Sequence, residues 1–430
     1  REKLKPRPAT ILAFLFAIDP GLVALSRISG GTILAVTFLL FAWGMWTNRR
    51  LTAAGIFLGL ALLSGPSVWS GFLILGLTGL FLKGINPKPT ADQRPLTEDQ
   101  QEPSTPIENR KSQIVNILTP LIATLLLAGT LFLTAPNGLS AALASLPAYL
   151  KGWVSASPTT SGRTLLTFAT YELLGISLAV ISLIRGFRTN SKRILRLSLW
   201  LAVALLLSVF YRQTDELAWA IIPLLTLAAL ELSRAFDMYR DEYVEVGVVV
   251  IALTILSAYI WFNVSNIALN PNQVPTTVPV FGIVNNPRYF VLFGSLTIML
   301  MSIGLVAFGW SARTARLGTI WSLVIFFGVY SLAAAWGASG LRSPGGVELW
   351  LSDSRPLHAD LLITSVDEIS EFSLGHIDAQ PVTIYGVSSP ALEWVLRDHA
   401  VTIVSTLDPQ VAPPVVVTNL MNDLALPSAY

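Results

Sequence analysis

The sequence predicts an α-helical membrane protein that crosses the bilayer several times and carries a small α/β domain near its C-terminal end. Hydrophobic residues make up 53% of the 430 residues and charged residues only 13%, about half the share of a typical soluble domain. Mean hydropathy is +0.62. The chain contains about eleven apolar runs, several of them near the ~20 residues that a spanning helix needs. After residue 337 the pattern changes to short strands alternating with helix.

The apolar runs predict the helices of the membrane domain, which we place at residues 1–337. The short runs from Leu51 to Leu82 are either two spans or a re-entrant pair. In chain order the runs are Pro8–Ile18, Thr32–Thr47, Leu51–Ser64, Ser70–Leu82, Ile114–Thr134, Thr164–Ile184, Ile194–Phe210, Leu217–Leu232, Val244–Phe262, Tyr289–Trp310 and Leu317–Trp336.

Basic loops predict the orientation, because Lys-rich and Arg-rich loops stay cytoplasmic. If the spans alternate, every basic loop falls on one side, and we expect that side to be the cytoplasm. The N-terminal residues are then cytoplasmic, and the C-terminal domain is extracytoplasmic, on a cell membrane. The basic loops are Arg1–Arg7, Asn48–Arg50, Lys83–Lys111, Arg185–Arg193, Arg234–Arg240 and Arg313–Arg316.

Two of the long loops differ in composition. Residues 83–111 are rich in Pro, Gln, Glu and Asp, which predicts a disordered cytoplasmic linker. The outer segment 135–163 contains Leu139–Trp153, whose Leu, Ala, Tyr and Trp recur at helical spacing. We therefore expect an amphipathic helix that lies on the membrane surface.

Glu231 and Glu245 lie near inner helix ends, and we expect them to pair with Arg234 or Arg240.

Residues 338–430 predict a small extracytoplasmic α/β domain. A helix is expected over Ser389–Asp398, with Ser389 as its cap, Pro390 in the first turn and Glu393 completing a capping box. The sequence stops at Tyr430 without a finishing element and opens on Arg1, so we expect the domain to be truncated and an upstream part to be missing. The predicted strands are Asp360–Thr364, Val382–Tyr385, Val401–Val404 and Val415–Thr418.

Several functional classes lack their sequence signals. Without Cys there are no disulfides, iron–sulfur clusters or thiolate zinc sites. No P-loop, dinucleotide fingerprint or nucleophile elbow is present. The basic residues are spread over the loops, so nucleic-acid binding is not predicted. The spacing of His358, His376 and His399 matches no metal site, and we expect ordinary surface or core roles for them.

Charged residues near the predicted outer helix ends are the candidates for function. Glu172 lies about two turns into the run that starts at Thr164, where an acid needs a partner, a bound cation or a cavity. The alternative is a structural ion pair with an arginine of a neighbouring helix. Asp215 and Glu216 open the next helix, where carboxylates favour the positive end of the dipole. That reading fits Glu216 better than Asp215.

Two arginines are candidate phosphate ligands at the same face. Arg212 stands at a helix-to-loop boundary, where its planar guanidinium suits a phosphate group. Arg212 could equally well anchor the helix end at the membrane interface. The same two interpretations apply to Arg27. Asp19, before Pro20, is expected to be a turn residue.

Four segments resemble membrane glycosyltransferases of the GT-C type, the superfamily of protein mannosyltransferases and aminoarabinose transferases. They are Ala17–Arg27 (AIDPGLVALSR), Leu165–Leu174 with its Tyr-Glu pair, Tyr211–Ala229 with Arg212 and Pro223, and Trp394–His399 (WVLRDH). The last is similar to a Trp-Tyr-Leu-Arg-Asp-Tyr element of the flippase-activity-associated branch. The superfamily's catalytic carboxylate lies in an outer loop that would precede Arg1. The acidic residue that often follows Ser-Arg is replaced here by Ile28–Thr32.

The resemblance implies transfer of a sugar from a polyprenyl-phosphate donor to a protein or glycan acceptor at the outer membrane face. Arg212 and Arg27 would contact the phosphate, and Glu172 and Asp215 would be candidate catalytic residues lining the cavity. The resemblance also allows a divalent metal ion (Mg²⁺ or Mn²⁺) to assist the reaction, but it does not indicate the ligands of that ion. Two other classes stay open: a non-catalytic scaffold with a partner-binding outer domain, and a transporter of lipid-linked sugars.

Overall fold

The computed structural model separates the chain into two compact units. The helical unit comprises Arg1–Ser343 with Glu348–Ser352, and the C-terminal unit comprises Pro344–Val347 with Asp353–Tyr430. The structure describes residues 5–27, 31–85, 107–135, 137–155, 159–269, 278–280, 283–285, 287–339, 341, 349–350, 359–387, 389–407 and 413–420.

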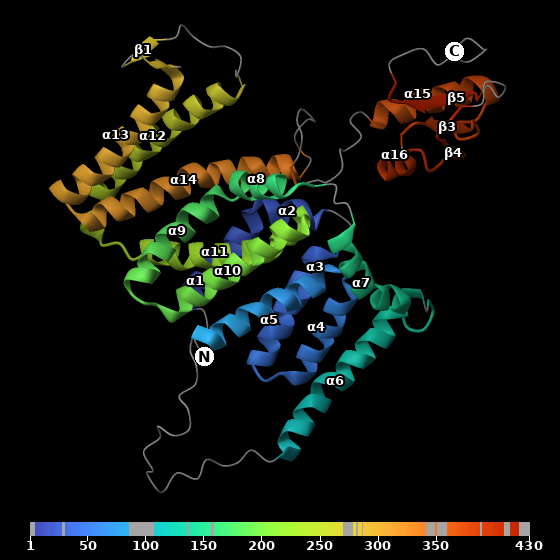
Figure 1. Ribbon diagram of the computed structural model, residues 1–430, viewed down its shortest axis with the longest axis horizontal. Helices are drawn as coiled ribbons and strands as arrows, with labels where there is room; N and C mark the ends of the chain where they lie inside the picture. Colours follow the sequence, from blue (N-terminus) through green and yellow to red (C-terminus); the bar gives the residue numbers. More distant parts are fainter. Residues whose placement is uncertain are drawn as a thin grey trace. The chain divides into compact units, whose positions relative to one another are not determined.

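The described part of the helical unit is almost entirely α-helical (Figure 1). Its helices are α1 (Pro6–Ile18), α2 (Pro20–Ser26), α3 (Thr32–Thr47), α4 (Leu51–Leu63), α5 (Ser67–Ile85), α6 (Ile107–Gly129), α7 (Asn137–Val154), α8 (Ser161–Tyr171), α9 (Leu173–Arg188), α10 (Lys192–Tyr211), α11 (Ala218–Ala235), α12 (Tyr243–Leu269), α13 (Pro287–Gly309) and α14 (Ala312–Ala338). A short antiparallel pair, β1 (Val278–Val280) and β2 (Ile283–Asn285), lies between α12 and α13.

Five stretches of the described chain are long and apolar enough to cross a membrane, each centred on one of the helices α10–α14. The number rises to seven if the bent pairs α1–α2 and α8–α9 each form one span. Helices α3 and α4, and the apolar parts of α5 and α6, are shorter than 18 residues. Helix length and composition thus support five to seven spans in the described chain, and the other predicted spans stay a prediction. The exposed apolar side chains of α13, such as Phe308 at 95%, suit a lipid-facing helix.

Helix α11 is the centre of the helical unit, because α9, α10 and α1 pack around it (Figure 1). Nearly every side chain from Ala218 to Leu232 is buried, including Trp219 and Leu227. A helix that is apolar all round must be enclosed by other helices or lipid. The sequence predicts this helix at Leu217–Leu232, close to its observed bounds.

Close packing of α4 against α6 depends on two glycines. A Cβ atom at Gly55 would lie 2.3 Å from the carbonyl oxygen of Ile117, and one at Gly59 would lie 2.9 Å from Thr124 Cβ. Small residues four positions apart allow two membrane helices to approach to backbone contact. The pair α4–α6 is thus held by shape as well as by apolar area.

Three of the predicted basic loops meet at one end of the helical unit. Arg7 pairs with Asp237 at 2.9 Å, and Arg313 pairs with Glu242 at 2.8 Å and donates to the Asp237 carbonyl. Exposed pairs of this kind add little stability, but they show that residues 7, 237–242 and 313 are neighbours. We call this end of the unit the basic end.

The buried acid of the basic end has a different partner from the one predicted. Glu231, 2% exposed, pairs with Arg185 of α9 at 2.5 Å, rather than with Arg234 or Arg240. The correction follows from the packing of α9 against α11, which brings a residue distant in sequence closer than the helix's own C-terminal arginines. Glu231 and Arg185 thus form a buried ion pair between two helices.

The two loops singled out by composition turn out to be partly helical. The predicted linker 83–111 overlaps α5 at its start and α6 at its end, and residues 86–106 lie outside the described part of the chain. The expected helix Leu139–Trp153 is confirmed as α7. Its Leu143, Leu150 and Val154 are exposed, whereas Tyr149 is buried against the rest of the unit.

The C-terminal unit contains a three-stranded parallel sheet in the order β4-β3-β5, with β3 (Val382–Tyr385), β4 (Val401–Val404) and β5 (Val415–Thr418) at their predicted bounds. The fourth predicted strand is wrong, because residues 360–364 open helix α15 (Ala359–Leu374). Its apolar residues recur at helical spacing beyond the five-residue window, so Val366 packs on the sheet.

Helix α16 (Pro390–Val395) is shorter than predicted. Ser389 stands at its N-cap position but makes no side-chain cap bond. Because that bond is missing, the predicted capping box is absent. The backbone N–H of Glu393 donates to the Ser389 carbonyl instead.

Candidate acidic site at two helix breaks

Asp19 and Glu172 each occupy a break between two helices. Helices α1 and α2 meet at Asp19 with a bend of 61°, and α8 and α9 meet at Glu172 with a bend of 83°. The sequence predicts one continuous helix from Thr164 to Ile184, and the break at Glu172 corrects it. Both carboxyls are enclosed, Asp19 at 3% and Glu172 at 2% exposure. An acid in such a position needs a partner.

The partner of each carboxyl is the other one. The Asp19 and Glu172 carboxyls lie close enough to interact, and Asp19 Oδ1 also accepts the Leu22 N–H at 2.8 Å. Two buried carboxylates side by side repel each other, so the contact favours a state in which one of the two carries a proton. Oε1 of Glu172 is buried with no N–H or O–H donor from the described residues. Glu172 therefore pairs with an acid, and not with the arginine of the structural alternative.

Asp19 has a larger role than the predicted turn. Its carboxylate is the N-cap of α2, as an Asp before Pro is expected to be, but the same side chain reaches the α8–α9 break. An Asp-Pro pair inside an apolar run is the sequence signal that could have identified it. A lone turn residue would have had no reason to be buried.

Glu216 forms a second buried acidic group, in a 3₁₀ turn (Thr214–Leu217) between α10 and α11. It is 3% exposed, and its Oε2 accepts the Ser67 hydroxyl at 3.1 Å. Trp219 Nε1 in turn donates to Ser67 Oγ at 3.1 Å. Ser67 opens α5, so the carboxylate lies at the positive end of that helix. Glu216 also opens the helical stretch Thr214–Ala235, as predicted, so its carboxylate lies at the start of two helices.

Helix α7 covers this acid through aromatic contacts. The Tyr211 hydroxyl donates to the Tyr149 carbonyl at 3.3 Å, and the two rings lie 5.1 Å apart. Trp153 packs on Tyr211 at the same ring distance. The Tyr149 and Ser70 hydroxyls lie beside the carboxylate without a hydrogen bond of normal geometry. Burial raises the pKa of the Tyr149 hydroxyl above its ordinary value.

The predicted arginines lie at exposed helix ends. Arg212 terminates α10 in the left-handed conformation (φ 58°, ψ 33°), which costs a non-glycine residue about 1 kcal/mol. Its carbonyl accepts the Thr159 hydroxyl. Arg27 ends α2 and is also exposed. Asp215 is half-buried, next to Thr214 in the same 3₁₀ turn.

Trp350 lies between the two acidic groups, although no sequence pattern singles it out. Its side chain is fully buried, and a Cβ atom on Gly21 would lie 2.4 Å from its ring. The ring also packs 6.1 Å from that of Tyr171, next to Glu172. Its carbonyl accepts the Thr214 hydroxyl at 3.4 Å, next to Asp215. The segment after α14 thereby joins the α2, α8 and α10 ends into one region, which we call the acidic end.

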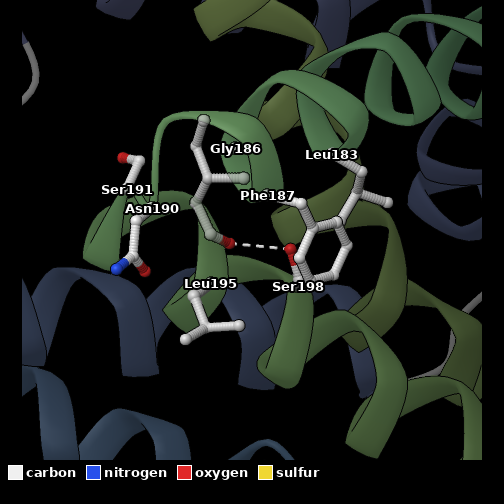
Figure 2. Close-up of a pocket in the computed structure, with 8 residues that line it drawn as sticks. Leu183, Gly186, Phe187, Asn190, Ser191, Leu195 and Ser198 are labelled. Atoms are coloured by element: carbon white, nitrogen blue, oxygen red, sulfur yellow. Dashed lines mark hydrogen bonds between the residues drawn. The ribbon is translucent and has the colours of Figure 1, made fainter.

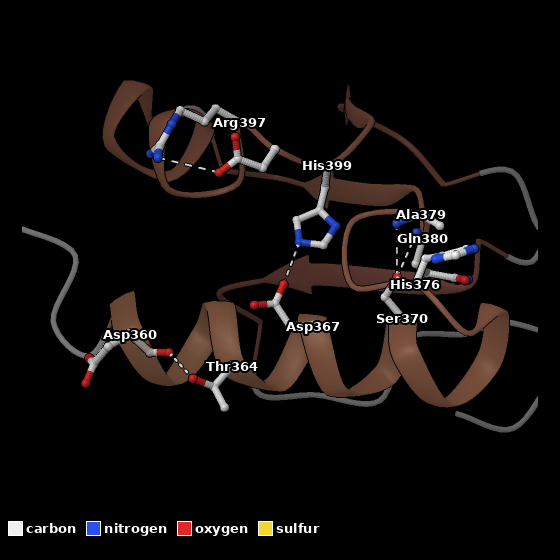
Figure 3. Close-up of polar contacts among 10 residues, drawn as sticks. Asp360, Thr364, Asp367, Ser370, His376, Ala379, Gln380, Arg397 and His399 are labelled. Atoms are coloured by element: carbon white, nitrogen blue, oxygen red, sulfur yellow. Dashed lines mark hydrogen bonds and ion pairs between the residues drawn. The ribbon is translucent and has the colours of Figure 1, made fainter.

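The C-terminal unit holds a third polar group, shown in Figure 3. His399, almost fully buried, contacts Asp367 of α15 through Nε2 at 3.1 Å, and the Ser370 hydroxyl accepts the N–H groups of Ala379 and Gln380. Together with Asp378, the Asp367 and His399 side chains offer ligand atoms within 4.8 Å of one another. His399 is thus a buried structural residue that ties the sheet to α15, as the sequence allows.

The fold and these contacts define a helical membrane protein with buried carboxyls at helix breaks and a small parallel-sheet unit. No family model, no curated protein and no solved structure matches the chain.

Proposed function

We propose that this protein is a membrane glycosyltransferase that moves a sugar from a polyprenyl-phosphate donor to a protein or glycan acceptor. The proposal includes a cell-membrane location, eleven membrane crossings with the basic end cytoplasmic, and an extracytoplasmic C-terminal unit. The reaction takes place at the acidic end. The acceptor hydroxyl attacks the anomeric carbon, the bond from that carbon to the phosphate oxygen breaks, and the hydroxyl proton passes to a carboxylate.

The observation that carries the proposal is the buried Asp19–Glu172 pair at two helix breaks. Burying two acids in an apolar bundle is costly, and a purely structural contact would be served equally well by an amide. A pair that already holds one proton can accept or release another, which is what a general base needs. Glu172 is our first candidate for that role and Asp215, at the same end, the second.

Cationic groups are needed where the phosphate leaves. Arg212 and Arg27 end helices α10 and α2 at exposed positions, and a guanidinium binds two phosphate oxygens at once. A divalent ion, Mg²⁺ or Mn²⁺, would also neutralise the phosphate, because such ions use one or two carboxylates and complete their shell with phosphate oxygens and water.

The test is sugar transfer by the full-length protein in proteoliposomes that contain a labelled polyprenyl-phosphate sugar. We expect Arg212→Ala to lower kcat/KM about 10- to 100-fold, the size of one charge-assisted hydrogen bond. Arg196→Ala is the matched control, since Arg196 is an exposed arginine near the other end of α10. Equal activity of both variants and the wild type would refute the phosphate assignment. No transfer from any lipid-linked sugar would refute the function.

A transporter of lipid-linked sugars is the second candidate, and the broken helices favour it. Transporters form their substrate sites at broken membrane helices, and Asp19 and Glu172 lie at two such breaks. A transporter would move a labelled lipid-linked sugar across the bilayer without forming a glycosylated acceptor. Measuring both products in the same proteoliposomes separates the two functions.

A further inference from the structure

The pocket between α9 and α10 lies around the turn that joins them, at the opposite end of α9 from Glu172 and of α10 from Tyr211. It is lined by Leu183, Gly186, Phe187, Asn190, Ser191, Ile194, Leu195 and Ser198 and has a volume of about 190 Å³ (Figure 2). Whole small-molecule ligands occupy roughly 300–1,000 Å³. The pocket therefore suits one part of a larger flexible molecule.

The lining divides into an apolar and a polar part. Leu183, Phe187 and Leu195 supply the apolar walls, and Asn190 and Ser191 lie on the turn that joins the two helices (Figure 2). The Ser198 hydroxyl is already bonded to the Ile194 carbonyl at 2.7 Å. The apolar part consequently offers no free hydrogen-bond donor there, and it suits a hydrocarbon chain.

Cations flank the polar part. Arg188 follows Phe187 directly, and Lys192 and Arg193 stand between the lining residues Ser191 and Ile194. Arg188 and Lys192 are exposed, and no carboxylate lies between residues 183 and 198. The segment 183–198 thus carries several cations and no acid of its own, which favours an anionic group at this turn.

The turn also lies at a membrane boundary. Lys192 is the first residue of a candidate span, Lys192–Tyr211, and Ile184 and Phe187 are 52% and 71% exposed just before it. A molecule that reaches from this turn along α9 would have its charged part at the water interface and its apolar part in the hydrocarbon region. Bilayer phospholipids have this form.

We propose that the α9–α10 pocket binds an anionic phospholipid, with its phosphate at Arg188, Lys192 and Arg193 and part of an acyl chain against Leu183, Phe187 and Leu195. The site is independent of the proposed sugar transfer, since it shares no residue with the acidic end. Charge selects the headgroup and the apolar walls select a lipid over a free phosphate.

The experiment is native mass spectrometry of the full chain with added phosphatidylglycerol, phosphatidylcholine or inorganic phosphate. We expect phosphatidylglycerol to bind best. Each cation that is neutralised should weaken the affinity for phosphatidylglycerol about fivefold, which is equivalent to about 1 kcal/mol per cation. The variants are Arg188→Gln, Lys192→Gln and Arg193→Gln, singly and combined. The double variant Arg49→Gln/Arg50→Gln, in a different basic loop, is the matched control.

A second variant tests the apolar part. Ser198→Phe fills the pocket and leaves the three cations in place. We expect this variant to bind less phosphatidylglycerol than the wild type. Its melting temperature should stay near the wild-type value. Equal binding of phosphatidylcholine, or of the control and triple variants, would overturn the headgroup assignment. Binding of inorganic phosphate as tight as that of the lipid, or full binding by Ser198→Phe, would overturn the acyl-chain assignment.

Discussion

Replacing Glu172 by glutamine and by alanine separates the structural part of the Asp19–Glu172 contact from its chemical part. Glutamine keeps the shape of the side chain, and its amide N–H can donate to the Asp19 carboxylate in place of the shared proton. Alanine removes the donor and leaves Asp19, 3% exposed, without its partner. The two variants should therefore differ sharply in stability.

The size of the difference follows from the burial of both groups. Leaving a buried polar group unsatisfied costs about 1–3 kcal/mol, and the space vacated by the glutamate side chain adds roughly 1 kcal/mol. We expect Glu172→Ala to lower the free energy of unfolding by about 2–4 kcal/mol. Glu172→Gln should change it by less than about 1 kcal/mol, because one hydrogen bond replaces another.

Unfolding in increasing SDS, followed by far-ultraviolet circular dichroism, measures both changes. Glu371→Gln and Glu371→Ala are the matched controls, since Glu371 is exposed on α15, and both should match the wild type. A Glu172→Ala midpoint equal to that of the wild type would show that no buried pair exists. A Glu172→Gln midpoint as low as that of Glu172→Ala would show that an amide cannot replace the shared proton.

Three further stability predictions use the same unfolding assay. Trp350→Ala should cost about 3–5 kcal/mol, the usual loss for a buried tryptophan, and an unchanged midpoint would deny its burial in the helical unit. Gly55→Ala should destabilise the protein, because the added methyl group would press on α6. Gly76→Ala, at an open helical position, should not. Similar unfolding midpoints for the two variants would refute the close approach of α4 and α6. Glu231→Gln should cost about 3 kcal/mol by leaving Arg185 unpaired, and adding Arg185→Gln should restore part of it. A double variant no better than the single one would show that the pair is not coupled.

The apolar pattern was sufficient to place most helices of the chain. Thr32–Thr47 and the three strands of the C-terminal sheet have their predicted bounds, because long apolar periodicity and short β-branched runs are strong local signals. The strand predicted at residues 360–364 is wrong because the pattern was judged over too short a window. A five-residue window contains less than two helical turns, too few to reveal the period of α15.

The candidate site was only partly accessible to sequence reasoning. Glu172 stood out as an acid within an apolar run, but the break beside it depends on packing that no local pattern encodes. The pairing with Asp19 joins positions 153 residues apart, the difference between 172 and 19. Glu216 opens the helical stretch Thr214–Ala235 as predicted, but its contact with Ser67 of α5 is tertiary and has no local signal. Trp350 follows a stretch without a periodic signal.

The most direct test of the proposed function is the rate of sugar transfer by Glu172→Gln, normalised to the folded protein in the same proteoliposomes. Removing a general base typically costs 10²–10⁴-fold in rate, and we expect Glu172→Gln to lose at least about 100-fold while its SDS midpoint stays near that of the wild type. A variant that transfers sugar within about twofold of the wild-type rate would contradict the account and leave the Asp19–Glu172 pair a structural contact.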